Sequence, residues 1–129
     1  MRCPFIAANW KMYKTVHEAV AFAKEFRAVV KDVSDVEIVL APPFTALHAV
    51  VDAARNSNIG VSGQDLHWER EGAFTGEVSA AMLKEAGAEY VIIGHSERRR
   101  LFHETDETVN RKLVAACGEH LTPIVCIGE

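Results

Sequence analysis

The chain has 129 residues, 49% of them hydrophobic and 25% charged, which is a globular composition and excludes a disordered or low-complexity chain. The length fits one domain, residues 1–129, and no apolar run approaches the roughly 18 residues of a membrane span or has the pattern of a signal peptide. The formal net charge of −4 argues against nucleic-acid binding, which needs a basic surface.

Five short apolar runs are nearly continuous rather than alternating, which is typical of strands in a parallel sheet covered on both faces. They are Phe5–Ala8, Val36–Ala41, Ile59–Val61, Tyr90–Ile93 and Ile124–Ile127. Their starts lie roughly 30 residues apart, which is the length of a β-α-β unit. The sequence therefore predicts an α/β fold with a parallel five-stranded sheet.

Helices are predicted between these runs from their caps and from helical spacing. The first starts at Thr15, which forms a capping box with Glu18; Ser79 caps the third, which Gly87 stops; Thr105 or Asp106 caps the fourth. The apolar positions expected to face the core are Val16, Val20, Ala23, Phe26 and Val30; Ala46, Leu47, Val50, Val51 and Ala54; Met82, Leu83 and Ala86; Val109, Leu113, Ala116 and Cys117.

Polar side chains follow most of the predicted strands, at the edge where parallel α/β sheets carry their chemistry. They are Asn9 and Lys11, Gln64 and Asp65, His95 and Glu97, and Glu129. The pattern indicates a site at this edge without naming a reaction. The cysteines Cys3, Cys117 and Cys126 lack metal-ligand spacing and are expected to be small buried residues in a reducing, cytoplasmic environment.

His95 is the sharpest local feature. Ser96 is predicted to cap a short helix that runs through Leu101, which places the imidazole at a helix N-terminus. That position favours the neutral ring, which can donate a hydrogen bond to a developing oxyanion. A structural histidine bonded to a neighbouring carbonyl fits the local sequence equally well. We assign no role to the other histidines, and no zinc-ligand set or glycine-rich nucleotide loop is present in the sequence.

Four segments together resemble the triosephosphate isomerases: Asn9–Met12, Gly72–Ser79, Tyr90–Arg99 and Cys126–Glu129. The resemblance runs through all 129 residues, with Tyr13 as a departure where many members have a small polar residue. It implies a (β/α)₈ barrel of about 250 residues, of which this chain would be the N-terminal half. The expected architecture is thus a half-barrel, the (βα)₄β₅ portion of that fold.

The resemblance also implies the interconversion of dihydroxyacetone phosphate and glyceraldehyde 3-phosphate without a cofactor or metal. Lys11 would supply positive charge to the reacting oxygen and to the phosphate, and Asn9 would donate to substrate oxygens. His95 would be the neutral electrophile, as is known for the family. Glu97 would orient Lys11 and Ser96 rather than act as the base.

A homodimer is implied as well. Phe74 and Thr75 would lie at the tip of a loop that enters the partner subunit, and Gln64 and Arg98 would support that contact. The family's catalytic carboxylate, its lid and most of its phosphate-binding loops have no counterpart in residues 1–129. We therefore expect no useful activity from this chain alone.

Three interpretations remain open. The chain is a half-enzyme completed by a second-half chain, a non-catalytic half-barrel that self-associates, or a binder of phosphate ligands without chemistry. The runs Phe5–Ala8 and Ile124–Ile127 are expected to form open sheet edges without a protecting Pro or Lys, which favours association. Candidate residues for the bare concave face are Ile6, Ile38, Ile92 and Val125.

Overall fold

The computed structural model describes residues 1–128, so that Glu129, expected at the carboxyl edge, lies outside the described residues. Five strands form one parallel sheet in the order β1-β2-β3-β4-β5. They are β1 (Phe5–Asn9), β2 (Glu37–Ala41), β3 (Ile59–Gly63), β4 (Tyr90–Ile93) and β5 (Thr122–Val125). This confirms the predicted five-stranded parallel half-barrel, with β1 and β5 at its open edges.

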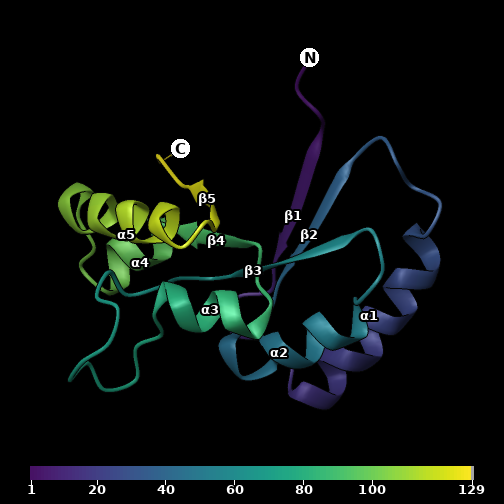
Figure 1. Ribbon diagram of the computed structural model, residues 1–129, viewed down its shortest axis with the longest axis horizontal. Helices are drawn as coiled ribbons and strands as arrows, with labels where there is room; N and C mark the ends of the chain where they lie inside the picture. The colour runs from purple at the N-terminus through teal and green to yellow at the C-terminus, as the bar shows by residue number, and fades with distance from the viewer. Residues whose placement is uncertain (129) are drawn as a thin grey trace.

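Helices alternate with the strands: α1 (Val16–Val30), α2 (Phe44–Ala53), α3 (Ala80–Ala86), then α4 (Ser96–Leu101) and α5 (Asp106–Gly118) together between β4 and β5. Figure 1 shows α1 and α2 side by side near the β2–β3 part of the curved sheet, with α4 and α5 near β4 and β5. No helix of residues 1–128 is long and apolar enough to cross a membrane.

The predicted caps of α1, α3 and α5 are confirmed. Thr15 accepts a hydrogen bond from the Glu18 amide at 3.4 Å and closes the capping box of α1. Ser79 accepts from the Met82 amide at 3.1 Å, and Thr105 rather than Asp106 caps α5. Local side-chain chemistry therefore sets where these helices begin.

The fifth strand lies two residues earlier than predicted, at Thr122–Val125 rather than Ile124–Ile127. The amides of Thr122 and Cys126 donate to Glu89 and Ile93, so even-numbered amides face β4. Pro123, which has no N–H, therefore faces the open edge, where a proline costs no ladder hydrogen bond. The expectation that this edge lacks a proline is wrong.

The two faces of the sheet have different roles. The face toward the helices carries the core, including Ile38, Leu40, Val61, Val91 and Ile93. Ile6 and Val125 pair in register with Ile38 and Ile93, so they also lie on this outer face. Of the four residues expected on the concave face, only Ile92 lies there. Continuous apolar runs carry no alternation, and the sequence therefore does not reveal which residues face inward.

The concave face is crossed by the Tyr90 side chain. A Cβ on Gly60 of β3 would lie 2.9 Å from the Tyr90 ring, so glycine leaves room for it. Tyr90 then donates to Glu37 of β2 at 3.1 Å and packs on Phe5 of β1, with ring centroids 5.5 Å apart. Burial, followed by the Glu37 contact, raises the pKa of Tyr90 to about 12. One side chain thus links four strands on the inner face.

Some residues expected in the core lie outside it. Val16 and Met82 are exposed, Met82 to 54%. Cys117 and Cys3 are exposed and Cys126 is half-buried, so the expected burial of cysteines is wrong for the first two. Helix α5 faces the core through Val109, Lys112 and Ala116, which places Cys117 a further 100° around the helix.

Candidate active site

A hollow of about 610 Å³ lies at the carboxyl ends of β1, β3 and β4. Its walls carry polar residues that the sequence predicted at this edge: Asn9, Lys11, Gln64, Asp65, His95 and Glu97. Arg98 and the apolar residues Met12, Tyr13, Phe44, Leu101 and Phe102 also line it and were not predicted there. Parallel strands end at the same edge, so residues distant in sequence meet here.

Lys11 is held in a left-handed backbone conformation, with φ of 55°. Its amide donates to Asn9 Oδ1 at 2.9 Å, and its carbonyl accepts from Gln64 Nε2 at 2.9 Å. The same Gln64 nitrogen donates to the Ala41 carbonyl at 2.8 Å, which ties the loop to β2. Because Asn9 uses its oxygen for the loop, its amide N–H groups remain for donation into the hollow.

His95, not Ser96, is the N-cap of α4. Its Nδ1 accepts a hydrogen bond from the Glu97 amide at 3.1 Å. A nitrogen that accepts carries no proton, so this bond assigns the proton of a neutral ring to Nε2. An aromatic ring at the cap position was not expected, because caps are usually Ser, Thr, Asp or Asn.

Glu97 contacts Lys11 through its side chain and His95 through its backbone amide. Lys11 Nζ lies 2.6 Å from Glu97 Oε1, whereas Glu97 Oε2, 3.6 Å from His95 Nδ1, makes no hydrogen bond to that unprotonated nitrogen. The hydrogen bond to Lys11 is the main cause that lowers the pKa of Glu97, and the same bond raises the pKa of Lys11. Both side chains are therefore ionised at neutral pH. Ser96 is exposed, and within residues 1–128 no hydrogen bond links it to Glu97.

A buried group of four charges lies beneath the hollow, and sequence reasoning did not identify it as a unit. Lys112 Nζ lies 2.7 Å from Asp65 and 2.5 Å from Glu104, and Arg98 Nε lies 3.1 Å from Asp65. Arg98 Nε is also 2.7 Å from Glu104 Oε2, without hydrogen-bond geometry, so that contact is electrostatic. Burial is the main cause that raises the pKa of Asp65. Lys112 shares the inner face of α5 with Val109 and Ala116, and that spacing is the signal the sequence offered.

The predicted interface residues lie in two places. Gln64 and Arg98 line the hollow, where Arg98 also lies over the Phe102 ring at 4.6 Å. Phe74 and Thr75 lie on a loop between β3 and α3 that extends away from the sheet (Figure 1). Phe74 stacks on His67 with ring centroids 4.2 Å apart, and Thr75 is exposed. Phe74 and Thr75 are therefore not brought together with Lys11 and His95.

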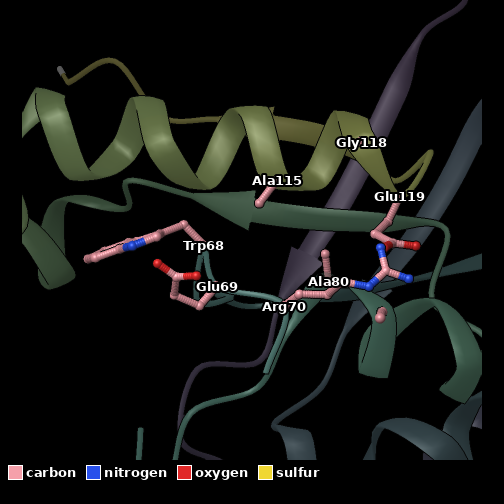
Figure 2. Close-up of a pocket in the computed structure, with 8 residues that line it drawn as sticks. Trp68, Glu69, Arg70, Ala80, Ala115, Gly118 and Glu119 are labelled. Carbon is pink, nitrogen blue, oxygen red and sulfur yellow. The ribbon is translucent and has the colours of Figure 1, made fainter. Parts of the chain in front are cut away.

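A second hollow, of about 210 Å³, lies between the Trp68–Arg70 segment and helices α3 and α5 (Figure 2). Its floor consists of small residues such as Ala80 and Ala115, and Arg70 pairs with Glu119 at 2.5 Å. Its strongest charges thus satisfy each other. Among residues 1–128 no group of three or more His, Cys, Asp or Glu side chains has the geometry to hold a metal ion.

Comparisons with known proteins give one consistent result. The family model described as triosephosphate isomerase matches residues 4–129. Triosephosphate isomerases of Carboxydothermus hydrogenoformans and Solibacter usitatus are 56% and 57% identical over all of this chain, which covers 51% and 52% of theirs. The crystal structure of triosephosphate isomerase from Bartonella henselae superposes with a TM-score of 0.93 at 41% identity, covering 99% of this chain and 53% of that one. The chain spans about half the length of these relatives.

Proposed function

The chain belongs to the triosephosphate isomerase family, and on that premise we propose that residues 1–129 supply the electrophilic half of an isomerase. Completed by a second-half chain that carries the base, it interconverts dihydroxyacetone phosphate and glyceraldehyde 3-phosphate. Proton abstraction next to the carbonyl gives an ene-diolate, so this half has to stabilise the negative charge that develops on oxygen.

The hydrogen bond from the Glu97 amide to His95 Nδ1 carries the proposal, because it leaves Nε2–H free to donate to the reacting oxygen. Lys11 adds a fixed positive charge to that oxygen and to the phosphate, and its bond to Glu97 keeps it protonated. Asn9 offers amide donors beside them. All three act on charge that grows in the transition state, which is where preorganised donors are most effective.

The base is proposed to come from another chain because both carboxylates that line the hollow are already paired. Glu97 pairs with Lys11, and Asp65 pairs with Lys112 and Arg98. The bond to Lys11 lowers the pKa of Glu97, which makes it a poor proton acceptor. Asp65 is buried, and each of its carboxylate oxygens already faces a cation. General-base catalysis contributes roughly 10²- to 10⁴-fold, so the 129-residue chain by itself is expected to be nearly inactive.

The test is reconstitution. The chain is mixed with the C-terminal half of the Carboxydothermus hydrogenoformans relative, and isomerisation is followed in a coupled assay. Activity is expected only in the mixture, and His95→Gln and Lys11→Ala are each expected to lower kcat by about 10²-fold or more. His17→Gln on the exposed face of α1 is the matched control and should leave kcat unchanged. A mixture whose rate does not depend on His95 and Lys11 contradicts the assignment.

We also propose that the chain associates with a second copy of itself through the hollow. Its rim carries exposed apolar side chains, with Met12 at 92% and Tyr13 at 72%, beside Leu101 and Phe102. An apolar rim of this kind favours association. The extended loop with Thr75 is the proposed counterpart. Sedimentation velocity tests this: Thr75→Arg should shift the chain toward monomer, and an unchanged distribution argues against the contact.

A further inference from the structure

The loop from Trp10 to Thr15 contains two residues in the left-handed backbone region, Lys11 with φ of 55° and Lys14 with φ of 76°. Residues with a side chain avoid this region because Cβ approaches the carbonyl oxygen too closely. Two such residues within four therefore need contacts that hold them. The loop matters because it carries the ammonium group of Lys11.

The two residues are held in different ways. Lys11 is fixed by hydrogen bonds on its amide and its carbonyl. In the described part of the chain, the backbone of Met12, Tyr13 and Lys14 makes no hydrogen bond. Lys14 is instead anchored by its side chain, whose Nζ lies 5.1 Å from the centre of the Phe22 ring and 5.7 Å from that of Trp10. A cation at such a distance is attracted to the ring face.

The aromatic rings beneath Lys14 pack against one another. Trp10 is buried, donates its amide to Ala41, and meets Phe22 edge-on with ring centroids 5.3 Å apart. Phe22 stacks in turn on Phe26 of the same helix, at 5.5 Å. Lys14 is only partly exposed, whereas Lys11, Met12, Tyr13 and Thr15 are exposed. The lysine side chain therefore ties the middle of the loop to α1.

We propose that Lys14 is a positioning residue for Lys11: its contact with Trp10 and Phe22 fixes the loop so that the Lys11 ammonium stays against Glu97 in the hollow. This deepens the proposed function, on which its role in catalysis rests. Without the anchor, no other contact among the described residues stabilises the left-handed backbone of Lys14. The loop then relaxes, and Lys11 Nζ leaves its position 2.6 Å from Glu97.

The experiment compares Lys14→Met, which removes the cation and keeps the stem, with Lys14→Arg, which keeps a cation over the rings. Lys24→Met on the exposed side of α1 is the control. The first measurement is an NMR titration of Lys11 Nζ in the 129-residue chain, which needs no enzymatic activity. In Lys14→Met the pKa of Lys11 should fall toward its ordinary value, and in Lys14→Arg and Lys24→Met it should stay raised.

The second measurement is kcat/KM of the reconstituted enzyme. It is expected to fall about tenfold in Lys14→Met, because small displacements of catalytic groups have large effects on the rate. In Lys14→Arg it should recover. Inactive wild-type mixtures would refute the proposed function and leave the titration to decide this inference. If Lys14→Met does not fold, Phe22→Leu removes the aromatic partner of the Lys14 ammonium and should lower the pKa of Lys11 in the same way. A folded Lys14→Met or Phe22→Leu with an unchanged Lys11 titration overturns the proposal.

Discussion

Replacing Lys112 with methionine removes the central cation of the buried charge group beneath the hollow. The side chains of Lys112, Asp65 and Glu104 are exposed to only 6%, 7% and 6%. In the variant the two carboxylates keep Arg98 as their only cation among the described residues. Removing one partner of a buried pair costs about 3–5 kcal/mol, because the other charge is left buried without compensation. The free energy of unfolding of a small protein is about 5–15 kcal/mol in total, so this loss is a large fraction of it.

The destabilisation should depend on pH in a defined direction. Burial already raises the pKa of Asp65, while Lys112 acts against that rise. Without Lys112 the pKa of Asp65 rises further, and the folded state then favours the protonated carboxyl more than the unfolded state does. A carboxyl pKa that is higher in the folded state lowers stability fully above the folded-state pKa, and this loss disappears as the pH falls to the unfolded-state pKa. The difference in the free energy of unfolding between wild type and Lys112→Met should therefore shrink as the pH falls from neutral through the pKa of Asp65.

The assay is urea unfolding followed by circular dichroism at several pH values. With an m-value of about 1–3 kcal/mol per M, the midpoint should fall by about 2 M at neutral pH. Arg111→Met is the matched control on the same helix, because Arg111 pairs with Glu107 at an exposed site and such pairs contribute about 0–1 kcal/mol. A Lys112→Met midpoint close to that of wild type, or a gap that widens in acid, refutes the reasoning.

Three further predictions concern the stability of the fold and the association of the chain. Thr15→Ala breaks the capping box of α1 and should lower stability by about 1 kcal/mol, read from the melting temperature; an unchanged melting temperature would mean that the cap is redundant. Gly60→Ala places a Cβ 2.9 Å from the Tyr90 ring and should cost about 1–3 kcal/mol in urea unfolding, and equal stability would show that the ring is free to move. Val125→Lys introduces a charge on the exposed edge strand β5 and should reduce the mean mass in sedimentation, which fails if association does not involve that edge.

The sequence predicted the elements with strong local chemistry. Thr15 and Ser79 begin their helices as expected, since a hydroxyl that accepts an amide hydrogen bond acts within four residues. The parallel arrangement of the strands was predicted from continuous apolar runs at β-α-β spacing. The start of β5 was predicted two residues too late because Pro123 weakens a strand prediction, whereas at an open edge the missing N–H has no effect.

The candidate site was predicted residue by residue but not as a network. Lys11, Asn9 and His95 lie at the strand ends where parallel topology brings them together. The pairing of Lys112 with Asp65 joins residues 47 positions apart in the sequence. The cap formed by the His95 ring is local, and it was not predicted because a ring nitrogen is not among the usual cap groups. A lysine on a polar helix is usually solvated, so its burial becomes evident only when its spacing with Val109 and Ala116 is considered.

The contacts of Tyr90 with the three strands that precede β4 all lie within this chain, on the concave face of the sheet. Tyr90 passes over Gly60 and contacts Glu37 and Phe5, so side chains of this chain support the curvature of the sheet. A complementary half would then dock onto a preformed surface, and backbone shifts of about 1 Å or less are expected for such docking. Its binding would be opposed mainly by lost rigid-body freedom, roughly 4–15 kcal/mol, and not by the cost of shaping the sheet.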